Sequence, residues 1–356
     1  MRTRIAENML MKLVGAGQSP WYDNIDRRLI ENGKLEELFD IGMLGVTSNP
    51  TIFEKAVSAS DVYDGMIKKL ASKGKTSVEI YDALTVEDVS MAADLLRDTY
   101  ERTNHLDGYV SIEVLPELAR DAAGTIKAAR DIFYRIGKPN IMIKVPGTAE
   151  SSGAIRELIK EGINLNVTLL FSIRHYQACA NAYIDGLQDR MKEGRPVKNI
   201  FSVASVFVSR VDTKLDKIFE EKKAEELKGK IAVGNAKMIY RKFRELDFKG
   251  GNVQRVLWAS TSAKNPSYSD VKYVEELIGQ NTINTMPPAT AAAFLDHGKA
   301  ETAVEKGLDK ARADLSVLPA LGINLEQVCQ EIQDAGLKAF QDSFDKLIGS
   351  IENKMQ

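Results

Sequence analysis

The chain alternates short runs of aliphatic and β-branched residues with longer stretches whose apolar residues recur at helical spacing. Eight runs have the length and composition of β-strands: residues 19–25, 44–49, 109–115, 140–146, 163–171, 201–209, 255–261 and 281–287. A closed barrel of alternating strands and helices requires this number of strands. We therefore expect an α/β fold, a single (β/α)8 TIM barrel with additional helices.

The stretches between these runs predict helices that pack on the barrel. After Thr85, apolar residues recur at helical spacing, and Thr85 with Asp88 resembles a helix N-terminal cap. The segment at about 54–107 is too long for one loop and one helix, so we expect a helical insertion there. Apolar spacing near the end predicts closing helices at about 324–353. No linker rich in Pro, Gly or Ser interrupts the chain, so we expect one domain over residues 1–356.

Composition narrows the range of partners. The chain has 48 Lys and Arg residues against 50 Asp and Glu, and its net charge of -2 gives no general attraction to nucleic acid or anionic membranes. No apolar run approaches the ~20 residues of a membrane helix, and we expect a cytoplasmic protein. Arg2, Arg4 and Lys12 weakly resemble an organelle-targeting segment, but Glu7 and the shortness of the segment argue against it. The 2 Cys and 3 His residues lack metal-ligand spacing, so we expect no metal.

Polar residues in three predicted strands share one face. In the run IMIKVP, Lys144 alternates with aliphatic residues that lie on the opposite face. The same alternation separates Glu113, in a second strand, and Asn166 and Thr168, in a third, from their aliphatic neighbours. A barrel strand turns its aliphatic face to the surrounding helices, so we expect these polar side chains to converge inside the barrel.

A buried lysine needs an explanation, because an unpaired ammonium in a dry interior costs several kcal/mol. One interpretation is that Lys144 and Glu113 form an ion pair that only fills the barrel. The other is that burial favours the free amine, which can attack a carbonyl and form a Schiff base without an external cofactor. Lys144 lies at the carboxyl end of its predicted strand, where barrel active sites are found, and this position favours the second interpretation.

A family resemblance rests on five runs: GVTSNPTIF (45–53), VSIEV (110–114), IMIKVPGT (141–148), GINLNVTLLFS (162–172) and SVFVSR (205–210). Together they resemble the transaldolase family of the class I, Schiff-base-forming aldolase superfamily. The runs follow the family's order along nearly the whole chain, and each lies at the end of a predicted strand. The insertion and the long C-terminal segment resemble the larger transaldolases rather than the short fructose-6-phosphate aldolases.

The resemblance implies catalytic roles for four residues. Lys144 would be the Schiff-base lysine. Asp23 would take the proton from the C4 hydroxyl of the sugar so that the C3–C4 bond breaks. Glu113 and Thr168 would move protons through a bound water during imine formation. Without the resemblance, Asp23 is equally consistent with a helix-capping aspartate.

The resemblance also implies contacts to the sugar. Asn49 and Asn166 would hydrogen-bond the hydroxyls of a dihydroxyacetone unit, and their alternatives are a turn asparagine before a proline and a satisfied core amide. Ser205 and Phe207 would line the pocket. Aldolase members of the superfamily often carry a tyrosine at the position of Phe207, where it helps water to release the three-carbon unit. A phenylalanine cannot position that water, which favours transfer to an acceptor.

Three residues are implied in phosphate binding. Arg210 would bind a phosphate at the barrel mouth with its forked donors, and a surface arginine is the alternative. Other transaldolases present a serine and an arginine after the seventh strand, where this chain has Ser262 and Lys264. Lysine keeps the positive charge but offers less geometric discrimination.

The resemblance thus implies an enzyme that needs no cofactor and binds small sugar phosphates, with a homodimer as a family-level expectation. A dihydroxyacetone unit would pass from sedoheptulose 7-phosphate or fructose 6-phosphate to glyceraldehyde 3-phosphate or erythrose 4-phosphate, as in the pentose phosphate pathway. The alternatives are a class I aldolase that releases free dihydroxyacetone and a sugar-phosphate-binding barrel without catalysis. A metal-dependent aldolase is disfavoured by the missing histidine cluster.

Overall fold

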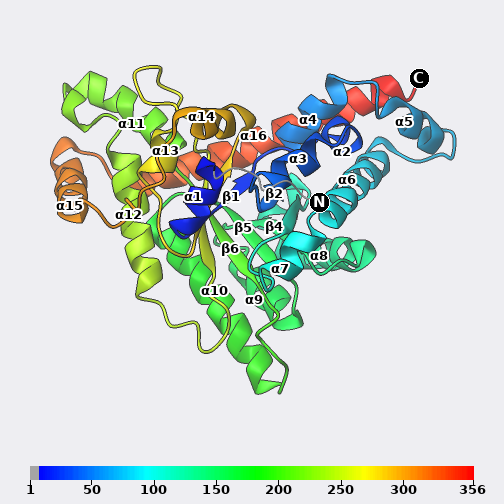
Figure 1. Ribbon diagram of the computed structural model, residues 1–356, viewed down its shortest axis with the longest axis horizontal. Coiled ribbons are helices and arrows are strands. Elements are labelled where there is room, and N and C mark those ends of the chain that lie inside the picture. The colour runs from blue at the N-terminus through cyan, green and yellow to red at the C-terminus, as the bar shows by residue number, and fades with distance from the viewer. Residues whose placement is uncertain (1–7) are drawn as a thin grey trace.

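The computed structural model describes residues 8–356, and its centre is a closed barrel of eight parallel strands (Figure 1). The strands neighbour one another in chain order, and the last pairs with the first. Their bounds are β1 (Gln18–Tyr22), β2 (Gly45–Thr47), β3 (Tyr109–Glu113), β4 (Ile141–Pro146), β5 (Leu165–Leu170), β6 (Ser202–Phe207), β7 (Arg255–Ala259) and β8 (Thr282–Met286). This topology confirms the predicted α/β class and the (β/α)8 TIM barrel.

Helices surround the barrel (Figure 1). Their bounds are α1 (Met9–Gly15), α2 (Arg27–Glu31), α3 (Lys34–Asp40), α4 (Pro50–Ser58), α5 (Asp64–Ala71), α6 (Ser77–Leu95), α7 (Arg97–Arg102), α8 (Ala122–Ile136), α9 (Ser152–Glu161), α10 (Ile173–Lys192), α11 (Ser209–Lys222), α12 (Ile231–Arg244), α13 (Lys272–Glu275), α14 (Pro288–His297), α15 (Leu308–Val317) and α16 (Leu325–Lys354). Short 3-10 turns are η1 (Pro116–Arg120), η2 (Glu225–Leu227) and η3 (Leu318–Leu321).

The register between strands places the predicted polar residues beside one another. Lys144 on β4 pairs with Glu113 on β3 and with Asn166 on β5. Register partners in a sheet point to the same face, so the three side chains share the barrel interior. The alternation in β5 ends after Thr168, because the register shifts there and Leu169 takes a φ of 59°.

Two helices from distant parts of the chain, α4 and α16, meet over the carboxyl ends of the strands. Helices α4 to α7 lie between β2 and β3, where the sequence predicts an insertion. α16 is one continuous helix of 30 residues, and it crosses this end of the barrel beside α4 (Figure 1). Thr51 of α4 and Ser343 of α16 share a hydrogen bond of 2.8 Å. Gln333 of α16 donates to the carbonyls of Gly147 and Leu169, at the ends of β4 and β5.

The predicted helix start at Thr85 is wrong. α6 begins at Ser77, with Thr76 as its cap and Glu79 completing a capping box. Thr85 lies inside this helix, and its hydroxyl donates to backbone carbonyls one turn earlier. Asp88 is fully buried and accepts hydrogen bonds from other parts of the fold. The apolar stripe located the helix but not its start, because the stripe continues before Thr85 through the buried residues Ile80, Tyr81 and Leu84.

The amino end of the barrel is closed by a network around a buried ion pair. Arg255 and Asp107 lie 3.1 Å apart. Asp107 also accepts from the Ser19 hydroxyl at 2.7 Å and from the Trp21 indole at 2.9 Å. Arg255 donates further to Ser19 and to the carbonyl oxygens of two other residues. The network fills this end of the barrel with paired polar groups.

No helix among residues 8–356 combines the length and the apolar character needed to cross a membrane. Arg2 and Arg4, which suggest the targeting alternative together with Lys12, and Glu7, which argues against it, lie outside the described residues.

Candidate active site

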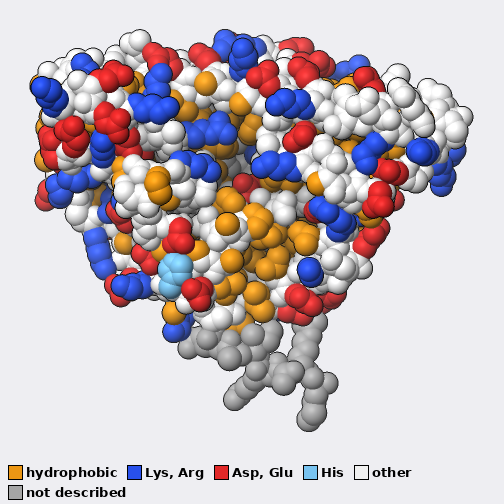
Figure 2. Space-filling view, turned by 90° about the horizontal axis from the view of Figure 1, so that it is seen from above, with side chains coloured by type: hydrophobic (Ala, Val, Ile, Leu, Met, Phe, Trp, Pro, Cys, Tyr) orange, Lys and Arg blue, Asp and Glu red, His pale blue; other side chains and the backbone are white. Residues whose placement is uncertain are grey.

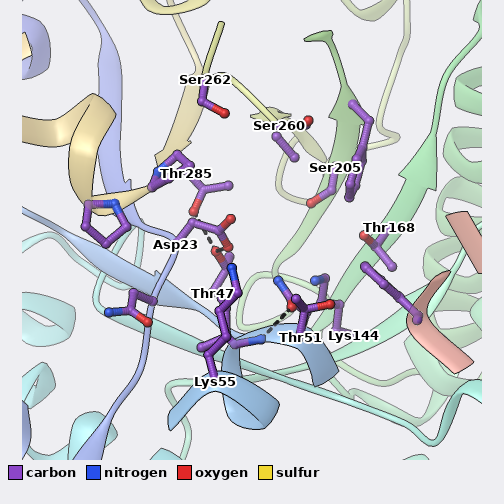
Figure 3. A pocket seen from close by; sticks show the side chains of 18 of the residues that line it. Asp23, Thr47, Thr51, Lys55, Lys144, Thr168, Ser205, Ser260, Ser262 and Thr285 are labelled. Atoms are coloured by element: carbon purple, nitrogen blue, oxygen red, sulfur yellow. Dashed lines mark hydrogen bonds between the residues drawn. The ribbon is translucent and has the colours of Figure 1, made fainter. Parts of the chain in front are cut away.

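A cavity of about 520 Å³ opens at the carboxyl ends of the strands. Figure 2 looks onto this face, where Lys and Arg side chains surround a central hollow. Most of the predicted site residues line the cavity, on segments from six different strands: Asp23, Asn49, Lys144, Thr168, Ser205, Phe207, Arg210, Ser262 and Lys264. Figure 3 labels Asp23, Lys144, Thr168, Ser205 and Ser262 among them. The fold therefore brings together residues that are far apart in the sequence. Glu113 and Asn166 do not line it.

Lys144 reaches the cavity from β4, and its side chain is only 5% exposed. Its Nζ donates to the Ser48 carbonyl at 3.0 Å and lies 3.2 Å from Oε2 of Glu113. The Phe340 ring of α16 lies 5.7 Å from Nζ. An amine held by one carbonyl and one carboxylate, beside an open cavity, has a fixed position and room for a ligand.

Glu113 lies behind Lys144, with its side chain 4% exposed. Burial raises the pKa of Glu113, the charge of the nearby Lys144 opposes the rise, and the charge of Asp23 adds to it. Thr168 lies on the cavity wall, and its buried Oγ1 has no hydrogen-bond partner within residues 8–356. A carboxyl group that holds a proton more readily therefore adjoins the amine, and a hydroxyl without a partner lies on the wall of the same cavity.

Asp23 follows β1 and is anchored by its N–H, which donates to the Met286 carbonyl at 2.9 Å. The hydroxyl of Thr47 donates to Oδ1 of Asp23 at 2.7 Å and lies 2.5 Å from the Thr285 hydroxyl (Figure 3). Burial raises the pKa of Asp23, while Lys144, the Thr47 hydrogen bond and Arg210 oppose the rise. The cap of α2 is Asp26, so the capping alternative for Asp23 is wrong.

The two asparagines have different surroundings. Asn49 lines the cavity and also caps α4, because its side chain accepts from the N–H of Ile52 at 3.0 Å. Asn166 is fully buried, donates to Ser111 at 3.0 Å and accepts from Ser205 at 2.6 Å. Its geometry matches the alternative of a satisfied core amide, and it meets the cavity through Ser205.

Positively charged side chains gather at the mouth. Arg210 lies in the first turn of α11, and its guanidinium lies 5.2 Å from the Phe207 ring. No acid forms a salt bridge with Arg210 in the described part of the chain. Lys264 donates to the Ser262 hydroxyl at 2.7 Å. Burial lowers the pKa of Lys264, and the charges of Arg210 and Lys55 lower it further. The three cations together create a positive potential at the mouth, which attracts an anion.

Sequence reasoning missed several residues that line the cavity. Thr47 and Thr285 lie within predicted strands, so their strand phase could have placed them inside the barrel. Lys55 follows Ile52 by three residues and Thr51 by four, a helical spacing that puts all three on the cavity side of α4. Phe340 comes from the distant α16, and no local pattern indicates its contact with the site.

Among residues 8–356, no group of three or more His, Cys, Asp or Glu side chains is arranged to hold a metal ion.

Sequence comparison places the chain among known proteins. The model of the transaldolase/fructose-6-phosphate aldolase family matches residues 20–351. The chain belongs to this family. It is 42% identical to a transaldolase of Trichodesmium erythraeum, with 98% of each chain covered. It is also 41% identical to transaldolase 2 of Nostoc punctiforme, with 99% of each chain covered.

A transaldolase of Thermobifida fusca is 40% identical, over 97% of this chain and 98% of that protein. Membership of the family confirms the resemblance to transaldolases, and it confirms the expectation of an enzyme of the transaldolase type.

Proposed function

We propose that this protein is a transaldolase in which Lys144 forms a Schiff base with a ketose phosphate. It transfers a dihydroxyacetone unit from sedoheptulose 7-phosphate or fructose 6-phosphate to glyceraldehyde 3-phosphate or erythrose 4-phosphate. The observation that carries the proposal is the position of the Lys144 amine, which lies at the cavity and within 3.2 Å of a buried carboxyl group. Family membership supports the reaction class.

Imine formation begins when the free amine of Lys144 attacks the C2 carbonyl of the ketose. The carbinolamine then loses its hydroxyl as water, which requires a proton donor. Glu113 suits this role, because its raised pKa lets it carry a proton and its carboxyl adjoins the amine. The free hydroxyl of Thr168 can hold the water that passes the proton on.

Aldol cleavage follows when Asp23 takes the proton of the C4 hydroxyl. The C3–C4 bond breaks, its electron pair moves into the iminium, and an aldose phosphate leaves the enamine behind. The reverse sequence with another aldehyde, followed by hydrolysis of the imine, gives the new ketose. The Thr47 hydrogen bond fixes the orientation of the Asp23 carboxylate for both proton transfers.

Phosphate binding falls to Arg210, Ser262 and Lys264 at the cavity mouth. Their positive charge suits a phosphate dianion, because neither cation is neutralised by an acidic side chain of the described chain. Phe207 offers no hydroxyl to activate water, which favours transfer over the release of free dihydroxyacetone.

The test is an assay of fructose 6-phosphate with and without erythrose 4-phosphate. We expect sedoheptulose 7-phosphate and glyceraldehyde 3-phosphate to form rapidly when the acceptor is present, and almost no free dihydroxyacetone to form when it is absent. Rapid release of dihydroxyacetone without acceptor would indicate the aldolase alternative. No turnover of either kind would indicate a binding protein.

The pentose phosphate pathway, a cytoplasmic location and a homodimer belong to the same proposal. Both cysteines are free and buried, which suits the reducing cytoplasm.

A further inference from the structure

The loop after β7 (residues 260–271) presents Ser262 and Lys264 to the cavity, and its start is tied to α11. The N–H of Ser209 donates to the Ser260 carbonyl at 3.1 Å, and the two hydroxyls share a hydrogen bond of 3.0 Å. Ser260 takes a φ of 53°, a conformation that a residue with a side chain keeps only where its surroundings enforce it. The loop therefore leaves the barrel in a fixed direction.

The far end of the loop is tied to α11 by two buried carboxylates. Asp216 accepts from the Tyr268 hydroxyl at 2.6 Å, and Asp212 accepts from the Tyr273 hydroxyl at 2.8 Å. Each carboxylate also accepts a backbone N–H from the segment around the start of α12. Tyr268 lies against Gly229, where an added Cβ would come within 2.8 Å of the ring. We call the residues Asp212, Asp216, Tyr268 and Tyr273 the Asp–Tyr clasp.

The clasp holds the loop against the repulsion between two positively charged side chains. Arg210 in the first turn of α11 and Lys264 in the loop carry like charges that face the same cavity, so they repel each other. Lys264 also lines a second cavity of about 240 Å³, whose wall includes Asp216 and Glu220. A loose loop would let Lys264 turn away from Arg210 and toward these acids.

We propose that the Asp–Tyr clasp is a phosphate-positioning device, which holds Lys264 beside Arg210 so that both cations bind one phosphate dianion. This inference rests on the proposed function, because it takes a sugar phosphate as the ligand. The four clasp residues touch no substrate and act through the loop, so they are positioning residues. They set specificity for phosphorylated sugars without taking part in the chemistry at Lys144.

The test compares Tyr268→Phe with wild type in two measurements. Isothermal titration measures the affinity of Arg210 and Lys264 for inorganic phosphate. Borohydride trapping of unphosphorylated dihydroxyacetone measures the reactivity of the Lys144 amine, which does not depend on phosphate binding. We expect phosphate affinity to fall about tenfold, since one hydrogen bond to a charged group is lost, while the trapping rate changes by less than about twofold. Tyr183→Phe is the matched control, because its buried hydroxyl donates to the Asn252 carbonyl at 2.9 Å and does not line the cavity.

Tyr273→Phe is the second variant, because it breaks the bond to Asp212 without a change of charge near Lys264, and thermal unfolding checks that each variant is folded. Phosphate affinity equal to wild type in both Tyr268→Phe and Tyr273→Phe would overturn the inference. An equal loss in Tyr183→Phe would overturn it as well, because the effect would then be general destabilisation. Absence of dihydroxyacetone trapping in wild type overturns the proposed function instead, and the phosphate titration still decides the role of the clasp.

Discussion

Two buried ion pairs lie inside the same barrel, one at each end. Lys144 and Glu113 are 3.2 Å apart at the carboxyl end, and Arg255 and Asp107 are 3.1 Å apart at the amino end. In both pairs the cationic side chain is 5% exposed and the carboxylate 4%. Distance and burial are therefore the same at a site that we propose to be reactive and at one that only fills the barrel.

The pairs differ in what surrounds them. At the amino end, Asp107 accepts from Ser19 and Trp21, and of the guanidinium nitrogens of Arg255 only Nε lacks a partner. At the carboxyl end, the Lys144 amine borders a cavity of about 520 Å³, and neither Oε2 of Glu113 nor the Thr168 hydroxyl on the cavity wall has a hydrogen-bond partner among residues 8–356. An ion pair that has nearly all of its hydrogen bonds satisfied and no open space beside it braces a fold, whereas one beside unpartnered polar groups and open space can react.

The largest expected effect is the loss of activity in Lys144→Met. We expect kcat to fall about 10⁴-fold or more, because no other group replaces the nucleophile. Stability should change little, since the raised pKa of Glu113 lets this carboxyl take up a proton once its partner is gone. A steady-state assay measures kcat and urea unfolding measures the stability. Lys338→Met, on the exposed face of α16, is the control. Activity of Lys144→Met near the wild-type value would contradict the proposal.

Arg255→Met should show the opposite pattern. It leaves Asp107 buried without a cation, so we expect the free energy of unfolding to fall by about 3–5 kcal/mol. The kcat of the folded fraction should stay near wild type. Adding Asp107→Leu should recover part of the stability, because the double variant leaves no unpaired charge. A large loss of kcat in Arg255→Met at full stability would remove the distinction between the two pairs.

Glu113→Gln separates chemistry from stability at the carboxyl end. We expect kcat to fall about 100-fold through loss of the proton donor. A raised folded-state pKa means that Glu113 contributes stability below its unfolded pKa and loses this contribution as the pH rises through the folded value. Removing the carboxylate should therefore not destabilise the fold at pH 7. Urea unfolding that shows a marked loss there would assign Glu113 a bracing role.

The smallest effect concerns the pH dependence of kcat/KM. Asp23 must be ionised to take a proton, and burial raises its pKa, so the rate should fall with falling pH at values above those of an ordinary aspartate. Thr47→Val removes a hydrogen bond that opposes the rise, which should move this acid limb to still higher pH. A limb that does not move, or that moves to lower pH, would remove Asp23 from the role of base.

The barrel and the interior position of Lys144 could be predicted because both depend on local alternation. Period-two patterns fix the face of a strand, and the structure confirms that Glu113, Lys144 and Asn166 share the interior. The alternation cannot give depth along the barrel axis. Asn166 therefore does not line the cavity, and its side-chain amide forms hydrogen bonds with Ser111 and Ser205 instead.

Other parts of the site depend on tertiary packing that no local pattern records. Phe340 reaches Lys144 because α16 crosses the mouth of the barrel, which a stripe of apolar residues does not indicate. The Asp–Tyr clasp joins α11 to a loop and a short helix from a later part of the chain. The start of α6 is a different case, because the buried residues Ile80, Tyr81 and Leu84 precede Thr85, and the cap Thr76 lies one turn before them.

Reductive trapping followed by peptide mass mapping tests the central claim most directly. With fructose 6-phosphate and borohydride, we expect the mass of a reduced three-carbon unit on the peptide that contains Lys144 and on no other lysine peptide. The same treatment of Lys144→Met should give no adduct. An adduct on a different lysine, or an unlabelled Lys144 in active enzyme, would contradict the account.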